Sequence, residues 1–280
     1  MKKIVLFLAI VCSINSVVAQ EKEGPKEGWT KKGNISLLLN QSAFNNWAAG
    51  GIDNVAGNLG LNYDFNYIKG DITWDNKIIA AYGITKIDGG DQQKTDDRLE
   101  LNSLVGKKAS GFWYYSLFAN FKTQMDSGFD KATNVKTTHF MSPAYLQVGP
   151  GMLWKKRDNL KVNIAPATSR LILVHDHFTV LGPSFGVEQG ETSRFELGAS
   201  VAAYYKLNIM ENVSMENTLN LYSNYLEDAQ NVDLDYTMNL VMKINKYLSA
   251  NLAFQTIYDD NAYQGFQTRE VFGLGVNYGF

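Results

Sequence analysis

Hydrophobic and polar residues alternate along several long stretches of the chain. From Ser193 to Leu207 the odd positions are mostly apolar and the even positions carry most of the polar side chains. The same period of two runs through residues 55–68, 232–244 and 271–280. Because successive side chains of an extended strand point to opposite faces, this pattern predicts β-strands.

Marking every such run predicts about twelve strands, an even number. They cover residues 34–43, 54–68, 71–82, 98–109, 113–126, 144–156, 160–170, 193–207, 213–225, 232–244, 247–258 and 267–280. Turns of a few residues alternate with connections that are mostly longer, and both termini fall on the side of the short turns. This layout is typical of an all-β, up-and-down transmembrane barrel of antiparallel strands with periplasmic termini.

A soluble β-sandwich or a lipocalin-like barrel would show the same alternation. Here, however, the face opposite the apolar residues is too charged to form a core. We expect its residues to line a lumen while the apolar face meets lipid. The predicted lumen-lining charges are Asp64, Asp75, Lys77, Arg98, Glu100, Lys122, Arg194, Glu196, Glu216, Asp233, Asp235, Lys243 and Glu270.

The first nineteen residues have the features of a secretory signal peptide. Lys2 and Lys3 precede an apolar run, and the small residue Ala19 suits cleavage before Gln20. We therefore divide the chain into a signal peptide (1–19), a short periplasmic segment (20–33) and an outer-membrane barrel (34–280).

Cys12 is the one cysteine of the sequence, and it leaves with the signal peptide. Attachment of a lipid to Cys12 is disfavoured because Val11 precedes it where a small residue is usual. The mature chain then has no thiol, which excludes disulfides and cysteine-based metal or catalytic sites. Its formal net charge changes from −2 to −4, since the signal peptide carries two lysines and no acidic residue. We expect no cofactor and no nucleic-acid partner.

The last strand ends in alternating apolar residues up to Tyr278 and Phe280. It resembles the C-terminal signal read by the barrel-assembly machinery of Gram-negative bacteria, so we expect that machinery and outer-membrane lipid as partners. Aromatic residues predict two interfacial belts. We place Phe65, Tyr67, Trp113, Tyr115, Trp154, Tyr205 and Tyr278 near the short turns and Trp74, Tyr82, Tyr225 and Tyr258 near the long loops.

A set of short motifs runs from about Trp47 to Tyr247. They are Trp47-Ala-Ala-Gly-Gly51, Trp74-Asp-Asn76, Tyr82-Gly83, Thr95-Asp-Asp-Arg-Leu99, Ser142-Pro-Ala144 and Ser223-Asn-Tyr225. In order and spacing the set resembles a family of Bacteroidota outer-membrane proteins of unknown function. The resemblance implies the compartment and the fold, and it brings no activity with it.

Two motifs of the outer loops raise catalysis or metal binding as alternatives. Gly182-Pro-Ser184-Phe-Gly186 matches G-x-S-x-G, but a nucleophile elbow needs a strand, a turn and a helix, and no helix is predicted there. His175 and His177, with His139 as a third ligand, are weak candidates for a metal site, and solvated loop histidines are the simpler interpretation. We predict no catalytic residue and no bound metal.

Two further features mark contact sites. If Lys156 pairs with Leu160, then Pro150 and Pro166 face each other across the sixth and seventh strands, and neither can donate a ladder hydrogen bond. We predict a bulge or thin seam there, which either adjusts the curvature of the wall or forms a site for a partner or lipid. Trp47, with Gly50 and Gly51, either anchors a turn in the outer interface or forms a contact surface for a ligand or a protein.

The charged lumen leaves two main functions open. One is a narrow channel for small polar solutes or ions. The other is a non-conducting accessory subunit of an envelope complex in barrel assembly or secretion, because acidic and basic lumen residues nearly balance and can pair. A hydrolase of the outer loops is a remote third. The predicted location is the outer membrane.

Overall fold

The computed structural model of the chain describes residues 27–43, 52–130 and 133–280. Within this part, twelve antiparallel strands close into one barrel, and β14 pairs with β1. Its strands are β1 (Gly28–Ser42), β2 (Asn54–Lys69), β3 (Ile72–Ile87), β4 (Gln93–Ser110), β5 (Trp113–Thr123), β8 (Ala144–Arg157), β9 (Leu160–Leu173), β10 (Ser193–Met210), β11 (Val213–Asn224), β12 (Val232–Lys243), β13 (Leu248–Asp259) and β14 (Tyr263–Gly279).

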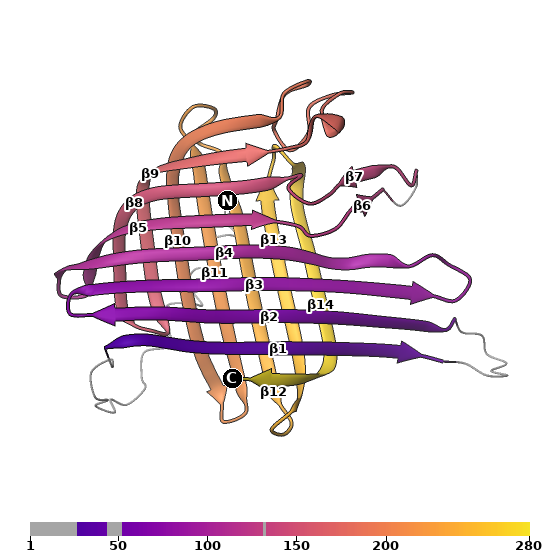
Figure 1. Cartoon of the computed structure of the whole chain (residues 1–280), viewed down its shortest axis with the longest axis horizontal. Helices are drawn as coiled ribbons and strands as arrows, with labels where there is room; N and C mark the ends of the chain where they lie inside the picture. The colour runs from indigo at the N-terminus through magenta and orange to yellow at the C-terminus, as the bar shows by residue number, and fades with distance from the viewer. Residues whose placement is uncertain (1–26, 44–51, 131–132) are drawn as a thin grey trace, which may run out of the picture.

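The remaining elements belong to the long loops. Strands β6 (Gly128–Phe129) and β7 (Lys136–Thr138) form a separate hairpin between β5 and β8, and the 3-10 helix η1 (Asp176–Phe178) lies between β9 and β10. None of the described helical residues belongs to a helix long and apolar enough to cross a membrane. In Figure 1 strands β1 to β5 of the near wall run across strands β10 to β13 of the far wall, as strongly tilted barrel strands do.

The predicted fold class is confirmed, with longer strands than the alternation indicated. β1 begins at Gly28 where the pattern predicted residue 34, so residues 28–33 are part of the barrel wall. Trp29 is paired with Tyr67 in this added part of β1. Neighbouring strands are held together by backbone hydrogen bonds, which do not require alternating apolar side chains. The strands can therefore continue beyond the segment in which a membrane imposes that alternation. The predicted signal peptide, together with Trp47, Gly50 and Gly51, lies outside the described residues.

The barrel is polar inside and apolar outside. Among the described residues, sixteen polar or charged residues are buried against seven apolar ones. Large apolar side chains are instead exposed on the outward face of the strands, including Ile35, Leu37, Leu39, Leu59, Leu101, Val105, Leu117, Leu146, Phe195, Leu197, Phe272, Leu274 and Val276. A soluble barrel would bury its apolar face, so this arrangement excludes the soluble alternatives.

Strand β9 contains the predicted bulge. Three residues of β8 lie between the pairs Val148–Ser169 and Met152–Ile164, opposite four residues of β9. The pairing with β10 shifts at the same place, between Gly198 and Ser200. The extra residue of β9 therefore lies around Pro166, whose ring cannot donate to the ladder.

The hairpin register that led to this prediction is partly wrong. Leu160 pairs with Arg157 and not with Lys156, because a second shift follows Lys155. The two strands return to the predicted register at Met152 and Ile164. A role of this region in binding a partner or lipid stays a prediction.

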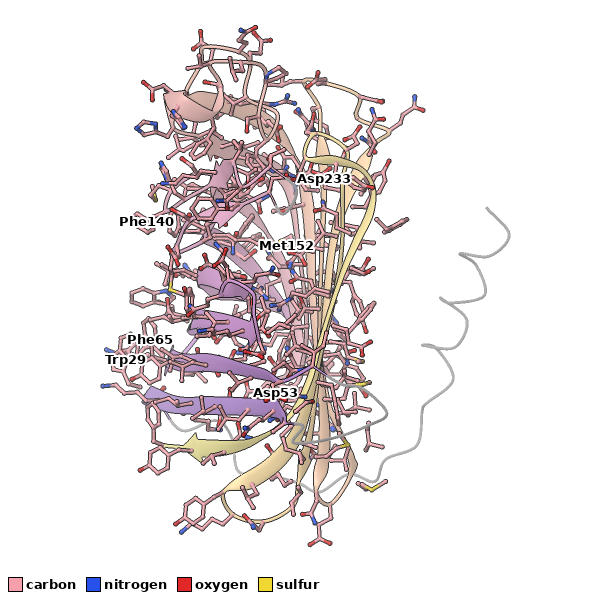
Figure 2. The ribbon with its side chains drawn as sticks, turned by 90° about the vertical axis from the view of Figure 1, so that its right-hand side faces the viewer. Trp29, Asp53, Phe65, Phe140, Met152 and Asp233 are labelled. Carbon is pink, nitrogen blue, oxygen red and sulfur yellow. The ribbon has the colours of Figure 1, made fainter. Side chains whose placement is uncertain are left out.

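An aromatic cluster covers the outside of the wall at the turn end, the end of the barrel where short turns join the strands; the opposite end, with the long loops, is the loop end. The ring of Trp29 lies 5.1 Å from Tyr67, 5.7 Å from Trp74 and 6.3 Å from Phe65, centroid to centroid. Figure 2 shows Trp29 and Phe65 together on the outer side of the wall. Trp74 was predicted near the long loops, which is wrong, because it follows the β2–β3 turn by only a few residues.

Candidate functional site in the barrel lumen

One ion pair joins opposite walls of the barrel. The Lys77 Nζ lies 2.6 Å from the Glu216 Oε1. Lys77 is on β3 and Glu216 on β11, and five strands separate β3 from β11 in either direction around the barrel. The two strands are thus diametrically opposite, and the two side chains together span the lumen. The lumen is therefore crossed at this level by a charge-assisted hydrogen bond.

Further ion pairs reach between strands that are not neighbours. Lys122 of β5 donates to Asp235 of β12 over 2.7 Å, with four strands between them on the shorter path. Arg269 of β14 pairs with Asp96 of β4 across three intervening strands. These contacts connect the walls laterally and fill space that an open pore would leave to water.

The turn end of the lumen holds a three-residue cluster. Asp75 accepts hydrogen bonds from Lys155 at 3.2 Å and from Lys161 at 2.9 Å. The ammonium groups of Lys161 and Lys77 also lie over the ring of Tyr204, at 5.4 and 5.7 Å from its centroid. Because Asp75 is buried, two cations around one carboxylate compensate the loss of its hydration.

The loop end holds a second buried cluster around Arg170. Its Nη2 donates to Asp233 at 2.6 Å and its Nε lies 3.4 Å from Glu196. Glu196 is 1% exposed, and the Nε of Arg194 approaches it to 2.9 Å from the other side. The guanidinium of Arg170 also lies 3.6 Å from the ring centroid of Tyr222. Removing one member would leave a buried charge without a partner.

Most of the predicted lumen charges lie on the inward face. Ion pairs within the lumen include Asp75, Lys77, Arg98, Glu100, Lys122, Arg194, Glu196, Glu216, Asp233 and Asp235. Asp64 is the cross-strand neighbour of Lys77 and so shares its face. Lys243 lies opposite the buried Ser249, at the turn end, where it is exposed.

Glu270 is the exception and lies on the outward face. Its cross-strand partner is Phe254, while the preceding Arg269 pairs with Gln255, which is buried inside. Glu270 is exposed and has the same phase as Phe272. The lumen residue of this stretch is therefore Arg269 and not Glu270.

The sequence interpretation missed several lumen charges, among them Asp96, Lys155, Lys161, Arg170 and Arg269. Arg170 was missed for a structural reason. Before the bulge the inward residues of β9 are odd-numbered, such as Asn163 and Ala165, and after it they are even-numbered, such as Thr168. The predicted bulge was the signal that could have reassigned Arg170 to the lumen.

The outer half of the lumen contains a cavity of about 360 Å³. It is lined by Lys94, Thr95, Asp96, Asp97, Arg98, Lys122, Thr123, Gln124, Pro143, Tyr145, Gln255, Ile257 and Arg269. These residues come from β4, β5, β8, β13 and β14 and from the loop after β5. The cavity thus lies above the level of the Lys77–Glu216 pair, toward the long loops.

The loop between β9 and β10 folds over one side of the outer mouth. Its Val187 is fully buried with Ile172 and Val174, and Tyr145 and Phe185 pack against them. The backbone N–H of His175 donates to the Ser142 Oγ at 2.8 Å, which ties the loop to its neighbour. This small apolar core holds the loop in a defined position.

The loop after β5 is anchored through Asp126. The hydroxyl of Tyr82 donates to its carboxylate at 2.8 Å, and the N–H of Ser127 donates at 2.7 Å. These two hydrogen bonds hold the pKa of the exposed Asp126 carboxyl below its usual value. The loop therefore remains attached to the wall when the carboxylate is charged, as it is at neutral pH.

The three histidines gather without forming a three-ligand site. The rings of His139 and His175 lie 5.3 Å apart, but the Nδ1 of His175 approaches Asp176 and that of His139 approaches the carbonyl of Phe140. Among the described residues, three ligand atoms come within 4.8 Å of one another only at Asp233, Asp259 and Asp260.

The G-x-S-x-G segment does not form a nucleophile elbow. Ser184 and Val187 form an isolated β-bridge around a tight turn, with Phe185 and Gly186 at positive φ. No helix follows within the described residues 182–192. The strand, turn and helix that expose a catalytic serine are thus not built here.

One family model matches part of the chain. Residues 39–129, about a third of the chain, match the family model "Protein of unknown function (DUF3078)". No curated protein matches the sequence. The resemblance noted from the motifs extends well beyond the matched residues, and an origin in Bacteroidota stays a prediction.

Several solved structures resemble the barrel at low identity. The translocator domain of the autotransporter NalP from Neisseria meningitidis has a TM-score of 0.37 and 9% identity, covering 100% of this chain and 94% of that one. The outer-membrane channel DcaP of Acinetobacter baumannii has a TM-score of 0.34 and 11% identity, covering 90% and 97%. The β domain of the Bordetella autotransporter BrkA has a TM-score of 0.32 and 10% identity, covering 91% and 100%.

Proposed function

We propose that this protein is an integral outer-membrane barrel whose lumen is closed at rest, and that it acts as a structural or accessory subunit of the envelope. The single observation that carries the closed lumen is the Lys77–Glu216 ion pair between diametrically opposite strands. In this proposal the protein has no catalytic role.

The membrane location rests on the two faces of the wall. Apolar residues such as Leu37 and Leu274 are exposed on the outside, whereas Glu196 and Arg170 are buried inside. In a hydrocarbon environment every backbone polar group needs an internal partner, and a closed barrel supplies one at each strand. Export by a cleaved signal peptide and insertion by the barrel-assembly machinery complete the proposed route.

The closed lumen rests on pairing at several levels. Asp75 with its two lysines occupies the turn end, Lys77 and Glu216 the middle, and Arg170 with Asp233 the loop end. A porin has an open lumen because its barrel has more than twelve strands or because no side chains bridge its interior. Opening a path here would separate several charge pairs at once, each at a cost in free energy.

Single-channel recording in planar bilayers tests this function. We expect the folded wild-type barrel to give no steady conductance steps. The double variant K77M/E216Q, which removes both charges of the pair, should show small steps because the middle of the lumen is no longer bridged. Heat-modifiable migration in gels confirms that both proteins are folded. Steady conductance of the wild type would contradict the closed lumen.

A narrow polar channel is the second candidate. The observation that favours it is the 360 Å³ cavity, which supplies an aqueous outer vestibule above the ion pairs. If the wild type conducts, the variant K122M/D235N should change its ion selectivity, because this pair lies between the cavity and the opposite wall. Unchanged selectivity would place the path elsewhere.

A further inference from the structure

We propose that the long loops hold a binding site for a monovalent copper ion, formed by the imidazoles of His139 and His175 and the thioether of Met141. All three residues line one hollow of about 250 Å³ between the loop that precedes β8 and the loop that follows β9. The inference concerns a ligand of the loops and does not rest on whether the lumen is closed.

In both imidazoles the Nδ1 atom is already engaged by an oxygen. The Nδ1 of His139 lies 2.6 Å from the Phe140 carbonyl, and the Nδ1 of His175 lies 2.7 Å from the Asp176 carboxylate. Each of these contacts requires a proton on Nδ1. The backbone N–H of His177 lies 3.2 Å from the same nitrogen of His175, but it has a closer acceptor in Asp176, at 2.7 Å. The neutral rings therefore keep their lone pairs on Nε2, and this form, with Nδ1–H held by a carbonyl or carboxylate, is the usual metal-binding one.

The two rings are spaced as ligands of one ion are. Imidazoles bound through nitrogen at about 2 Å have their ring centres about 3 Å from the metal, and at the tetrahedral angle these centres lie about 5 Å apart. The ring centroids of His139 and His175 are 5.3 Å apart. The two loops need not approach each other for both rings to bind one ion.

Hydrogen bonds hold the segments that carry the three side chains. The N–H of His139 donates to the Ser142 carbonyl at 3.0 Å and the N–H of Ser142 donates back at 2.9 Å, which closes the turn that contains Met141. The N–H of Met141 donates to the Thr123 Oγ1 at 3.2 Å, and the N–H of His175 donates to the Ser142 Oγ at 2.8 Å. The site is thus largely formed before an ion arrives, which lowers the entropic cost of binding.

The kinds of donor atom favour copper. Imidazole nitrogen binds several transition metals, whereas a thioether sulfur is a soft ligand that suits Cu(I). Among the described residues that line the hollow none is acidic, so a hard cation such as Mg²⁺ or Ca²⁺ finds no carboxylate there. The side chain of His175 is 58% exposed, so ions can reach the site from solution.

Competition with the chromophoric Cu(I) chelator bicinchoninate, without oxygen, tests the site on the untagged barrel in detergent. Every protein carries C12S, which removes the one thiol of the sequence. We expect H139A and H175A each to weaken Cu(I) binding by about tenfold or more, because each removes one ligand. Cu(I) binding that is absent from the folded wild type, or that is unchanged in both variants, would overturn the proposal.

Two further variants test the sulfur and the choice of histidines. M141L keeps the bulk of the side chain, and we expect it to weaken Cu(I) binding and to remove the copper–sulfur distance from the X-ray absorption spectrum. It should leave the weaker binding of Ni²⁺ by the imidazoles unchanged.

The matched control is H177A, since the ring of His177 packs on Phe178 at 5.3 Å and does not line the hollow. It should bind Cu(I) as the wild type does. Heat-modifiable gel migration checks that each variant is folded. A loss in H177A as large as in H139A, or a copper–sulfur distance that persists in M141L, would also overturn the proposal.

Discussion

Phe280 closes the barrel by folding its ring over Gly33. The two residues exchange backbone hydrogen bonds, with the Gly33 N–H donating to the Phe280 carbonyl at 2.8 Å and the Phe280 N–H donating back at 3.0 Å. A side chain on Gly33 would collide with the ring. The ring also stacks on Tyr63 and Tyr278, at centroid distances of 6.0 and 6.2 Å. The final residue thus packs across the closing seam, over a glycine that leaves room for it.

Substituting Gly33 should therefore weaken the closure. In G33A the new methyl group displaces the Phe280 ring, and we expect the free energy of unfolding to fall by about 1–3 kcal/mol, the usual cost of overpacking. Urea denaturation from lipid vesicles measures the change. G57A is the matched control, since a Cβ there meets only Leu39, at 3.6 Å. Equal stability of G33A and wild type would contradict a role for the ring.

Removing Arg170 should be far more costly than removing a surface arginine. R170M leaves Glu196 with Arg194 as a cationic partner and leaves Asp233 with no ion pair among the described residues, both in the lumen. We expect a loss of about 3–5 kcal/mol in the free energy of unfolding, as for one partner of a buried pair. The control is R157M, at the exposed end of β8. A loss of similar size in the two variants would rule out this explanation.

Deleting Ala167 tests whether the bulge is one extra residue of β9. Pro166 and Ala167 are both exposed on the outside, so one residue of the pair is extra to the alternation. Without it the alternation from Asn163 to Arg170 is regular, and both of these residues keep facing the lumen. We therefore expect a folded barrel, measured by heat-modifiable gel migration. Deletion of Met238 in the regular strand β12 shifts the strand by one residue, which exchanges its faces, and should give little or no folded barrel.

An arginine on the outward face distinguishes a membrane barrel from a soluble one. Leu37 is exposed in the middle of β1, so L37R would place a charge in lipid and should destabilise the barrel in vesicles by about 2–4 kcal/mol. Leu226, an exposed leucine of the β11–β12 loop, provides the control L226R, which should be neutral. An L37R variant as stable as L226R in vesicles would place that face outside the membrane.

Local patterning determined the general architecture. The twelve strands and their two faces are written into the alternation, because a period of two is a property of each segment by itself. The same reasoning assigned Lys77, Glu216 and most other charges to the lumen. It failed at Glu270, where Arg269 carries the inward phase, and at Arg170, where one extra residue in β9 reverses the faces.

The partners of the lumen charges were decided by the tertiary structure alone. Lys77 and Glu216 are 139 residues apart, and no local pattern links them. They meet because closure of the barrel and the stagger of its strands bring β3 and β11 to opposite walls at one level. The near balance of acidic and basic residues predicted that the lumen charges would pair. Which residues pair, and the position of the cavity beside Arg98 and Lys122, are determined by how the barrel closes.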